Sequence, residues 1–385
     1  MNNPCKTFEG SFASWFGTSY AFSFWKGRVA LYSILKALEV GSGDEVILPG
    51  YTCVMDVNPV KYLGAKPVYV DIEPDTFNIN VNLIKEKITP NTKVIIAQHT
   101  YGYPCDMDTI LEIASKNNVT VIEDCCLSLG SKYKGKLAGT FGKAVYFSFQ
   151  WNKPFTTGLG GMAITNDEEL AEKIRSLRDE ESCVPSKRET LLLALQLAAY
   201  RVFVYPRTTA LAQMIFRYLT KKRIVVGSSS SVEYEPEMPP GFFKTMSAVQ
   251  AKSGLRQLRK IEANIAHRKR MARLYDELLM EKGWSVQKYD ASVIDPVLVR
   301  YPVRITEKNR ALAEAAKAGI ELGSWFECPL HPIETPLEQY GYEIGMCPEA
   351  EKASREVVNL PVHPRAGERT VKRTVEFITR FTEAK

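Results

Sequence analysis

Short runs of apolar and β-branched residues alternate with helix-like stretches over the first two-thirds of the chain, and this alternation most constrains the fold. The runs occupy residues 45–48, 67–70, 93–97, 119–122, 144–149 and 162–165. Strands that are covered on both faces form continuous apolar runs, and the helices between them act as crossover connections. The sequence therefore predicts an α/β fold with a mostly parallel sheet, in which ligands bind at the carboxyl ends of the strands.

Two helical segments suggest a division into two domains. Arg28–Val40 carries apolar residues at helical spacing and ends at the Gly-Ser-Gly of residues 41–43, a typical helix stop. Phe242–Glu281 is predicted to be one long helix that leads into a smaller α+β region. We therefore expect a large domain at residues 1–245, followed at residues 246–385 by a linking helix and a small C-terminal domain.

The segment Thr190–Tyr218 is strongly apolar but has charged interruptions, and three basic residues follow at 221–223. One interpretation is an interfacial amphipathic helix with a basic anchor, which allows peripheral contact of residues 190–223 with a membrane surface. The other is a pair of buried or subunit-interface helices, the commoner arrangement for such segments. We predict the second arrangement, with residues 190–218 as an apolar insert in the large domain.

The composition excludes several classes of protein. Of the 385 residues, 45% are hydrophobic and 24% are charged, and the formal net charge is +6. This excess of positive charge is small for a chain of this length. It suits binding of anionic small molecules better than binding of nucleic acid, which usually requires a concentrated basic stripe. No apolar run approaches the ~20 residues of a transmembrane helix, and the N-terminus lacks a signal-peptide pattern. We predict no nucleic-acid partner and no transmembrane segment.

The eight cysteines contain no CxxC pair and no His/Cys spacing that suits zinc. In a chain of this length without a secretion signal, free thiols in a reducing compartment are expected. We therefore predict a cytoplasmic protein without disulfides and without a metal site.

The sequence has no P-loop, no GxGxxG after the first strand, no GxSxG and no HExxH. A different set of residues follows the predicted strand ends. Lys153 lies just beyond the run 144–149, Asp124 follows the run 119–122, and Gly27-Arg28 opens the first helix. These groups meet the needs of pyridoxal phosphate (PLP): an amine for a Schiff base, a carboxylate for the pyridine nitrogen, and helix N–H groups for the phosphate.

Further segments have an order and spacing found in a known enzyme family. They are Gly43–Pro49, Gly64–Asp71, Gly102 with Asp106–Asp108, Val121–Asp124, Ser148-Phe149 with Lys153, Gly160-Gly161, Gln250-Ala251 with Gly254-Leu255 and Gln257-Leu258, Cys347-Pro348 with Ala350-Glu351, and Leu360–Pro364. Through them the chain resembles, over most of its length, the DegT/DnrJ family of sugar aminotransferases, which are fold-type-I PLP enzymes.

The resemblance implies a role for each residue near the cofactor. Lys153 would form the Schiff base and move the proton between the amino-bearing carbon and the cofactor. Asp124 would pair with the pyridinium nitrogen, and Ser148 would hydrogen-bond the phosphate. Gly27 and Arg28 stand where family members usually carry Gly-Thr. The backbone donors survive this change, and Arg28 either adds a charged contact to the phosphate or faces outward.

Two departures from the family pattern concern the cofactor pocket. The polar residue usually found three positions after the aspartate is Leu127 here. The aromatic residue that usually stacks on the ring falls near Cys53, with Tyr51 two residues before it. A thiol contact at Cys53 is therefore implied, and Tyr51 would point to the opposite face of an extended segment. Cys125 and Cys126 are interpreted as small buried residues under the cofactor.

Two histidines are candidates for substrate binding. His99 follows the run 93–97 and is either a substrate or cofactor contact or a core histidine with its hydrogen bonds satisfied. His331 aligns with a family position on the small-domain side of the cleft, which implies a substrate contact, while the alternative is a histidine in a loop.

The resemblance implies an aminotransferase that moves an amino group from an amino acid, with glutamate as the expected donor, to a nucleotide-linked keto-sugar. A homodimer is also implied, since fold-type-I sites are usually built across a dimer interface. One alternative is a PLP-dependent sugar dehydratase, but a histidine replaces the lysine in those relatives. The other is a catalytically silent regulatory or scaffold protein, which the presence of Lys153, Asp124 and Ser148 together disfavours.

Overall fold

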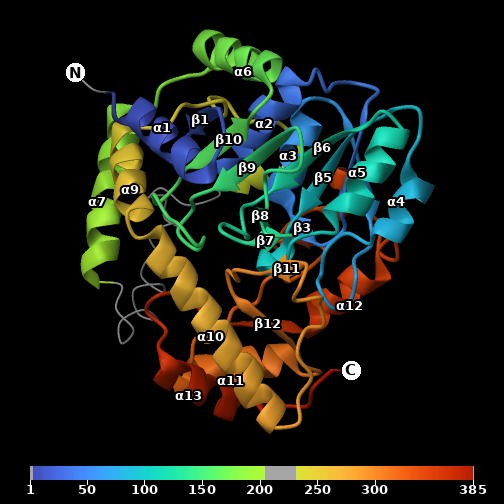
Figure 1. Cartoon of the computed structure of the whole chain (residues 1–385), viewed down its shortest axis with the longest axis vertical. Helices are drawn as coiled ribbons and strands as arrows, with labels where there is room; N and C mark the ends of the chain where they lie inside the picture. Colours follow the sequence, from blue (N-terminus) through green and yellow to red (C-terminus); the bar gives the residue numbers. More distant parts are fainter. Residues whose placement is uncertain (1–2, 204–230, 385) are drawn as a thin grey trace.

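The computed structural model describes residues 3–203 and 231–384, and within these residues a seven-stranded sheet forms the centre of the fold (Figure 1). Its strands, in spatial order, are β1 (Tyr20–Phe24), β10 (Gly161–Thr165), β9 (Ala144–Ser148), β6 (Thr120–Asp124), β5 (Thr92–Gln98), β2 (Glu45–Pro49) and β4 (Lys66–Val70). The five strands from β9 to β4 are parallel, and β10 is antiparallel to both of its neighbours. The predicted α/β fold with a mostly parallel sheet is confirmed.

Helices cover the sheet and carry the crossover connections (Figure 1). They are α1 (Pro4–Phe16), α2 (Gly27–Ala37), α3 (Val54–Tyr62), α4 (Val81–Lys87), α5 (Met107–Lys116) and α6 (Glu168–Glu181). Helix α2 packs against β9 and β10, and every one of its residues except Lys36 is buried. Most of these buried residues are apolar or small. This packing fixes the N-terminus of α2 beside the ends of the central strands.

The predicted single helix at Phe242–Glu281 is wrong, because the structure divides it into α9 (Ala248–Leu258) and α10 (Ile261–Glu281). Ser247 and Gln250 form a capping box that begins α9, with Ser247 Oγ accepting the Gln250 N–H. Before this cap, the chain is extended and lies against the end of β1, where Trp25 N donates to Lys244 O at 3.0 Å. The side-chain cap and this extended pairing prevent the helix from starting earlier.

The C-terminal part contains small sheets between helices. Its elements are β11 (Ile294–Asp295), β12 (Tyr301–Arg304), α11 (Lys308–Ala318), β13 (Leu330–His331), α12 (Pro348–Glu356), β14 (Val357–Leu360) and α13 (Glu368–Ile378). Strand β12 pairs with β14, and β11 pairs with β7 (Lys132–Tyr133), which in turn pairs with β8 (Lys136–Leu137). Three short 3-10 helices complete the described elements: η1 (Thr100–Gly102), η2 (Ser231–Tyr234) and η3 (Leu337–Tyr340).

The strand pair β3–β13 connects the C-terminal part to the segment that follows β2 of the central sheet. Strand β3 (Thr52–Cys53) pairs in parallel with β13, so that His331 lies opposite Cys53. One apolar cluster also extends from α2 and β6 to α13 and β14. Contacts therefore cross the predicted boundary at residue 245, and α9 packs on α1. The division into 1–245 and 246–385 remains a prediction.

The apolar segment after α6 begins as helix α7 (Lys187–Phe203). Its buried residues Leu193 and Leu197 pack with Trp25 and Leu159, while Leu191 and Leu195 are 61% and 59% exposed. The remainder of the predicted insert, residues 204–218, and the basic residues 221–223 lie outside the described residues. Within the described ranges, no helix combines the length and apolar character that crossing a membrane requires.

Candidate active site

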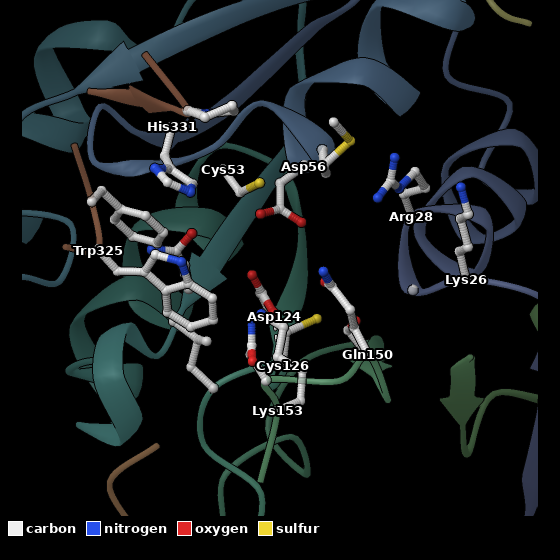
Figure 2. A pocket seen from close by; sticks show the side chains of 18 of the residues that line it. Lys26, Arg28, Cys53, Asp56, Asp124, Cys126, Gln150, Lys153, Trp325 and His331 are labelled. Atoms are coloured by element: carbon white, nitrogen blue, oxygen red, sulfur yellow. Dashed lines mark hydrogen bonds between the residues drawn. The ribbon is translucent and has the colours of Figure 1, made fainter. Parts of the chain in front are cut away.

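A cavity of about 230 Å³ lies where the predicted strand ends meet (Figure 2). Every residue predicted for the site except His99 lines it: Gly27, Arg28, Cys53, Asp124, Ser148, Lys153 and His331. These residues come from segments far apart in the sequence. The parallel sheet brings several of these segments together at the carboxyl ends of its strands. The cavity is therefore the candidate active site.

Lys153 is held at the tip of the loop that connects β9 to β10. The base of this loop is closed by hydrogen bonds from Phe149 N to Gly160 O at 2.8 Å and from Thr157 N to Phe149 O at 2.9 Å. The ammonium Nζ of Lys153 lies 5.1 Å from the centroid of the Trp325 ring, within the range of a cation–π contact. The closed loop and this contact together keep the amine at the cavity.

Asp124 is the last residue of β6 and is only 2% exposed. Its Oδ1 accepts the backbone N–H of Cys126 at 2.8 Å, which fixes the orientation of the carboxylate at the strand end. Figure 2 shows Asp124 among the side chains that surround the cavity, with Lys153 nearby. A buried carboxylate in this position suits a cationic ring nitrogen, because an opposite charge offsets the cost of its burial.

The N-terminus of α2 approaches Ser148 so closely that no side chain fits between them. A Cβ atom on Gly27 would lie 2.7 Å from Ser148 Cβ. The first N–H groups of a helix have no partner within the helix and favour anions, and the Ser148 hydroxyl adds a further donor. Glycine at residue 27 thus preserves a cradle of the kind that binds a phosphate.

We expect the Gly27→Ala variant to bind PLP at least about tenfold more weakly, because overpacking of a tight contact typically costs about 1–3 kcal/mol. Titration of the cofactor-free protein with PLP, followed by absorbance, measures this loss. Gly10→Ala is the matched control, since Gly10 is also in a helix and a Cβ there meets nothing within 4 Å. Equal affinity in the two variants would contradict the assignment of the cradle.

Arg28 does not face outward, because it is buried and its Nη1 lies 2.8 Å from Glu233 Oε1. Lys26 Nζ contacts the same carboxylate at 2.9 Å. Burial, reinforced by the neighbouring charge of Arg28, lowers the pKa of Lys26 to about 8. Both cations beside the α2 N-terminus thus contact Glu233, and their positive charges lie at this end of the cavity.

Cys53 and His331 face the cavity from the β3–β13 pair. Burial raises the pKa of the Cys53 thiol to about 11, so it is a neutral contact. Burial, with the charge of Lys308 as a smaller cause, lowers the pKa of His331 to about 4. His331 is therefore neutral at physiological pH and can either donate or accept a hydrogen bond. Tyr51, by contrast, is fully buried and its hydroxyl lies 2.8 Å from that of Tyr101.

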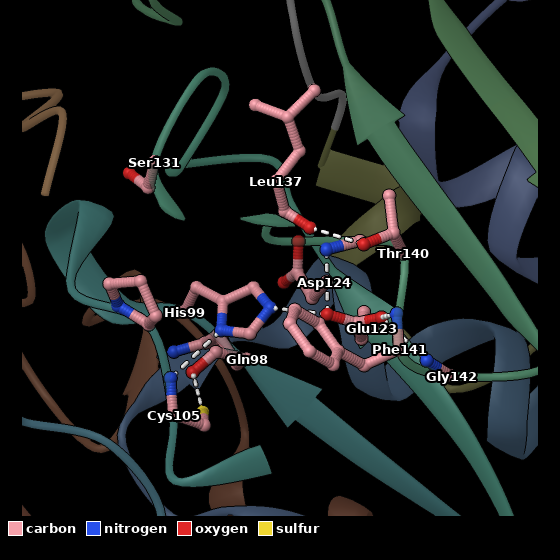
Figure 3. Close-up of polar contacts among 12 residues, drawn as sticks. Gln98, His99, Cys105, Glu123, Asp124, Ser131, Leu137, Thr140, Phe141 and Gly142 are labelled. Atoms are coloured by element: carbon pink, nitrogen blue, oxygen red, sulfur yellow. Dashed lines mark hydrogen bonds and ion pairs between the residues drawn. The ribbon is translucent and has the colours of Figure 1, made fainter. Parts of the chain in front are cut away.

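The substrate or cofactor contact considered for His99 is corrected by the structure, which supports the alternative of a satisfied core histidine (Figure 3). Its Nε2 lies 3.0 Å from Glu123 Oε2, and its Nδ1 accepts the Cys105 N–H at 3.0 Å. Glu123 also accepts the backbone N–H groups of residues 139, 141 and 142, which fastens this loop to β6. Cys125 lies in the same cluster, but burial raises its pKa well above the usual value. We interpret the cluster as structural.

Asp56 and Trp325 are among the cavity residues that the sequence analysis did not predict. Asp56 is in the first turn of α3, three residues after Cys53, and a helical period places such residues on one face. That spacing could have identified it. Trp325 lies in an irregular segment, held by a hydrogen bond from its N–H to Asn359 Oδ1 at 2.8 Å. No local pattern indicates its position.

The donor set fits PLP. The cavity offers an amine, a buried carboxylate and a glycine cradle beside a serine hydroxyl, which match the aldehyde, ring nitrogen and phosphate of this cofactor. Trp325 and Cys53 also line the cavity, where the family pattern leads one to expect a single stacked aromatic residue. Leu127 also lines the cavity and supplies no polar contact there.

Comparison with known proteins agrees with this chemistry. The model of the DegT/DnrJ/EryC1/StrS aminotransferase family matches residues 2–194 and 210–379. GDP-perosamine synthase from Caulobacter vibrioides is 33% identical over 374 residues, which cover 96% of this chain and 87% of that protein. UDP-2-acetamido-2-deoxy-3-oxo-D-glucuronate aminotransferase from Pseudomonas aeruginosa is 32% identical over 360 residues, which cover 92% of this chain and 84% of the relative.

A solved structure is similar over the same length. The putative sugar aminotransferase Spr1654 from Streptococcus pneumoniae, in its PMP form, superimposes with a TM-score of 0.77 at 25% identity, covering 99% of this chain and 92% of that one. The same Streptococcus protein has a PLP form with a TM-score of 0.76. The chain therefore belongs to the DegT/DnrJ/EryC1/StrS aminotransferase family and is a PLP-dependent aminotransferase of the fold-type-I class.

Proposed function

We propose that this enzyme transfers an amino group from an amino acid, glutamate, to a keto-sugar linked to a nucleotide. The observation that carries the proposal is the convergence of Lys153, Asp124 and the α2 N-terminus on one cavity. The names of the GDP-perosamine synthase and of the UDP-linked 3-oxo-glucuronate aminotransferase support a nucleotide-linked sugar as the acceptor. Lys26 and Arg28, which line the cavity at the α2 end, are cations of the kind that suit a substrate with phosphate groups.

PLP, when bound, supplies an aldehyde that holds an amino group and a ring that accepts electrons. Lys153 Nζ would hold the aldehyde between turnovers and then move a proton to and from the reacting carbon. Asp124 would keep the ring nitrogen protonated by remaining charged beside it. One lysine serves both half-reactions, because its amine is a base in one direction and its ammonium an acid in the other.

The remaining cavity residues would orient the cofactor and the substrates. Ser148 and the N–H groups at Gly27 would bind the cofactor phosphate. Trp325 would cover the amine of Lys153 and exclude water from it. His331, neutral at physiological pH, would hydrogen-bond a hydroxyl group of the acceptor sugar.

A two-step absorbance experiment tests the function. Glutamate is expected to bleach the visible band of the PLP-loaded enzyme, and a GDP- or UDP-linked keto-sugar is expected to restore it, with an amino-sugar nucleotide detected by mass spectrometry. Recovery of a dehydrated sugar without an amino group would instead identify a dehydratase. No change in the band with any amino acid would favour a regulatory or scaffold protein.

We further propose a homodimer that works in the cytoplasm. Leu191 and Leu195, four residues apart on the exposed face of α7, support a subunit contact. The eight cysteines, all within the described residues, are free thiols, which suits a reducing compartment. Contact of residues 190–223 with a membrane surface remains a separate prediction, which co-sedimentation with liposomes at low salt tests.

Replacement of Leu191 and Leu195 together by lysine is expected to convert the dimer into a monomer, because the charges cannot be buried unpaired at the interface. Sedimentation equilibrium of the PLP-loaded protein measures the mass. The control replaces two lysines that are exposed elsewhere, Lys136 and Lys282, with glutamine. A wild-type protein that is fully active as a monomer would refute the proposal.

A further inference from the structure

Asp56 faces the cavity, but the reaction described above gives it no role. It lies in the first turn of α3, and Figure 2 shows its carboxyl group directed into the space above Asp124. Its Oδ1 accepts the hydroxyl proton of Tyr146 at 2.9 Å, and its Oδ2 lies 3.2 Å from Thr52 Oγ1. Both contacts are half-buried, so these hydrogen bonds decide how well a charged Asp56 is stabilised in place of water.

The hydroxyl proton of Thr52 has two acceptors within reach, Gln98 Oε1 and Asp56 Oδ2. Gln98 Nε2 donates to the Tyr51 carbonyl oxygen at 3.0 Å, which fixes the amide so that its oxygen faces Thr52. Thr52 has one hydroxyl proton, and Gln98 Oε1, 2.5 Å away, can only accept it. The hydrogen bond that Thr52 donates to Asp56 Oδ2, at 3.2 Å, is then the weaker of the two, so Thr52 does little to offset the burial of a charged Asp56.

The surroundings of Asp56 favour a protonated carboxyl group. Burial and the nearby charge of Asp124 raise the pKa of Asp56 to about 7, against the opposing effects of Lys153 and of the hydrogen bonds from Tyr146 and Thr52. Asp124 accepts the backbone N–H of Cys126, a contact that suits a charged carboxylate. Two carboxyl groups in one low-dielectric site do not both ionise at low cost, so their environments assign them different roles.

We propose that Asp56 is a positioning residue of the cofactor site, which holds a proton beside the charged Asp124 and releases it to water above neutral pH. The O–H bond of the acid breaks, the proton passes to solvent, and a second negative charge remains near the carboxylate that binds the ring nitrogen. The strength with which the site holds a protonated ring thus increases with pH. This inference rests on the proposed placement of the ring nitrogen at Asp124.

Three other ionisable groups beside Asp56 do not change charge in this range. Burial raises the pKa of Cys53 to about 11 and raises those of Cys126 and Tyr146 well above their usual values, so all three stay neutral. The remaining charged groups that face Asp56 from neighbouring elements are Asp124 on β6 and Lys153 in the loop after β9. A pH response that depends on Asp56 can therefore be isolated by substitution.

Asp56→Asn tests the proposal without disturbing the fold. The Asn amide is neutral, and its Oδ1 can still accept the Tyr146 hydroxyl proton, so the variant mimics the protonated form. The dissociation constant for PLP is measured on wild type and variant at about pH 5.5 and about pH 8.5. At the higher pH, only the wild type carries the additional negative charge at residue 56. We therefore expect the ratio of the variant's dissociation constant to that of the wild type to be about ten times larger at about pH 8.5 than at about pH 5.5. A factor of ten corresponds to one pKa unit of interaction between Asp56 and the protonated ring.

Two further measurements do not depend on the loaded enzyme. In the cofactor-free protein, the infrared band of a protonated carboxyl group should be present near neutral pH and absent from Asp56→Asn. The folded chain also binds this proton more tightly than the unfolded chain, whose Asp pKa is 3.8. The melting temperature of the wild type relative to Asp56→Asn should therefore fall as the pH rises from about 4 to about 7.

Asp75→Asn, at an exposed position away from the cavity, is the control and should behave as the wild type in all three measurements. A ratio of dissociation constants that stays constant or decreases with pH, while both proteins bind PLP, would overturn the role of Asp56 alone. An infrared band that survives in Asp56→Asn would do the same. Failure of the wild type to bind PLP at any pH would instead refute the placement of the cofactor.

Discussion

Lys153→Ala is expected to lower the rate of amino transfer by about a thousandfold or more, because the variant loses both the group that holds the cofactor aldehyde and the acid–base group at the reacting carbon. No other lysine among the residues that line the cavity replaces it, since Lys26 is held by Glu233 at the α2 end. Stopped-flow absorbance with glutamate measures each half-reaction. Borohydride reduction followed by peptide mass spectrometry locates the attachment of PLP in the wild type.

The Lys153 prediction has a matched control. Lys136→Ala removes an exposed lysine in the strand β8, and it should leave both the attachment and the rate unchanged. Addition of small primary amines should restore part of the lost rate in Lys153→Ala, because a free amine can occupy the space of the truncated side chain. Attachment of PLP to a different lysine in the wild type, or a rate that survives in Lys153→Ala, would refute the assignment of Lys153.

Asp124→Asn is expected to lower the rate by about a hundredfold to a thousandfold through the loss of one preorganised charge in a buried site. Asparagine has nearly the same shape, and its Oδ1 can still accept the Cys126 N–H that fixes the aspartate at 2.8 Å. The fold and the binding of the phosphate should therefore persist. The neutral amide cannot keep the ring nitrogen protonated, so the loss falls on the chemical step.

Single-turnover kinetics and a PLP titration separate these effects for Asp124→Asn. We expect the rate of the chemical step to fall and the dissociation constant for PLP to rise much less. The Gly27→Ala variant should behave in the opposite way, since it changes the phosphate cradle and leaves the carboxylate intact. A variant Asp124→Asn that keeps the wild-type rate would show that the ring nitrogen lies elsewhere.

Local sequence patterns predicted much of the sheet, because the apolar character of a buried strand is contained within its own residues. Every predicted apolar run corresponds to a strand of the central sheet, from β2 to β10. The predicted helix Phe242–Glu281 failed for a related reason. Its apolar periodicity continues through residues 259 and 260, where the backbone leaves the helix between α9 and α10. The spacing of apolar residues therefore gives no sign of this break.

The candidate site was predicted only in part. Residues that the parallel sheet positions were predicted, whereas some of those positioned by contacts with distant parts of the chain were not. Asp124 and Ser148 end strands of the parallel sheet and Lys153 follows one, so the sheet itself brings them together. His99 also follows such a strand, yet its side chain is buried and its hydrogen bonds are satisfied by Glu123 and the Cys105 N–H. The direction of a side chain at a strand end depends on which partners pack around it, and these are not contained in the local sequence.

The sequence by itself determined the α/β architecture, the cofactor lysine and aspartate as candidates, and the family, since strand periodicity and motif spacing are local properties of the chain. The tertiary structure alone decided which distant side chains complete the cavity. The β3–β13 pair brings His331 opposite Cys53, packing holds Trp325 near the Lys153 amine, and α3 places Asp56 at the same cavity as Asp124. Such contacts join residues far apart in the sequence, and only the packed chain brings their donors and acceptors within hydrogen-bonding distance.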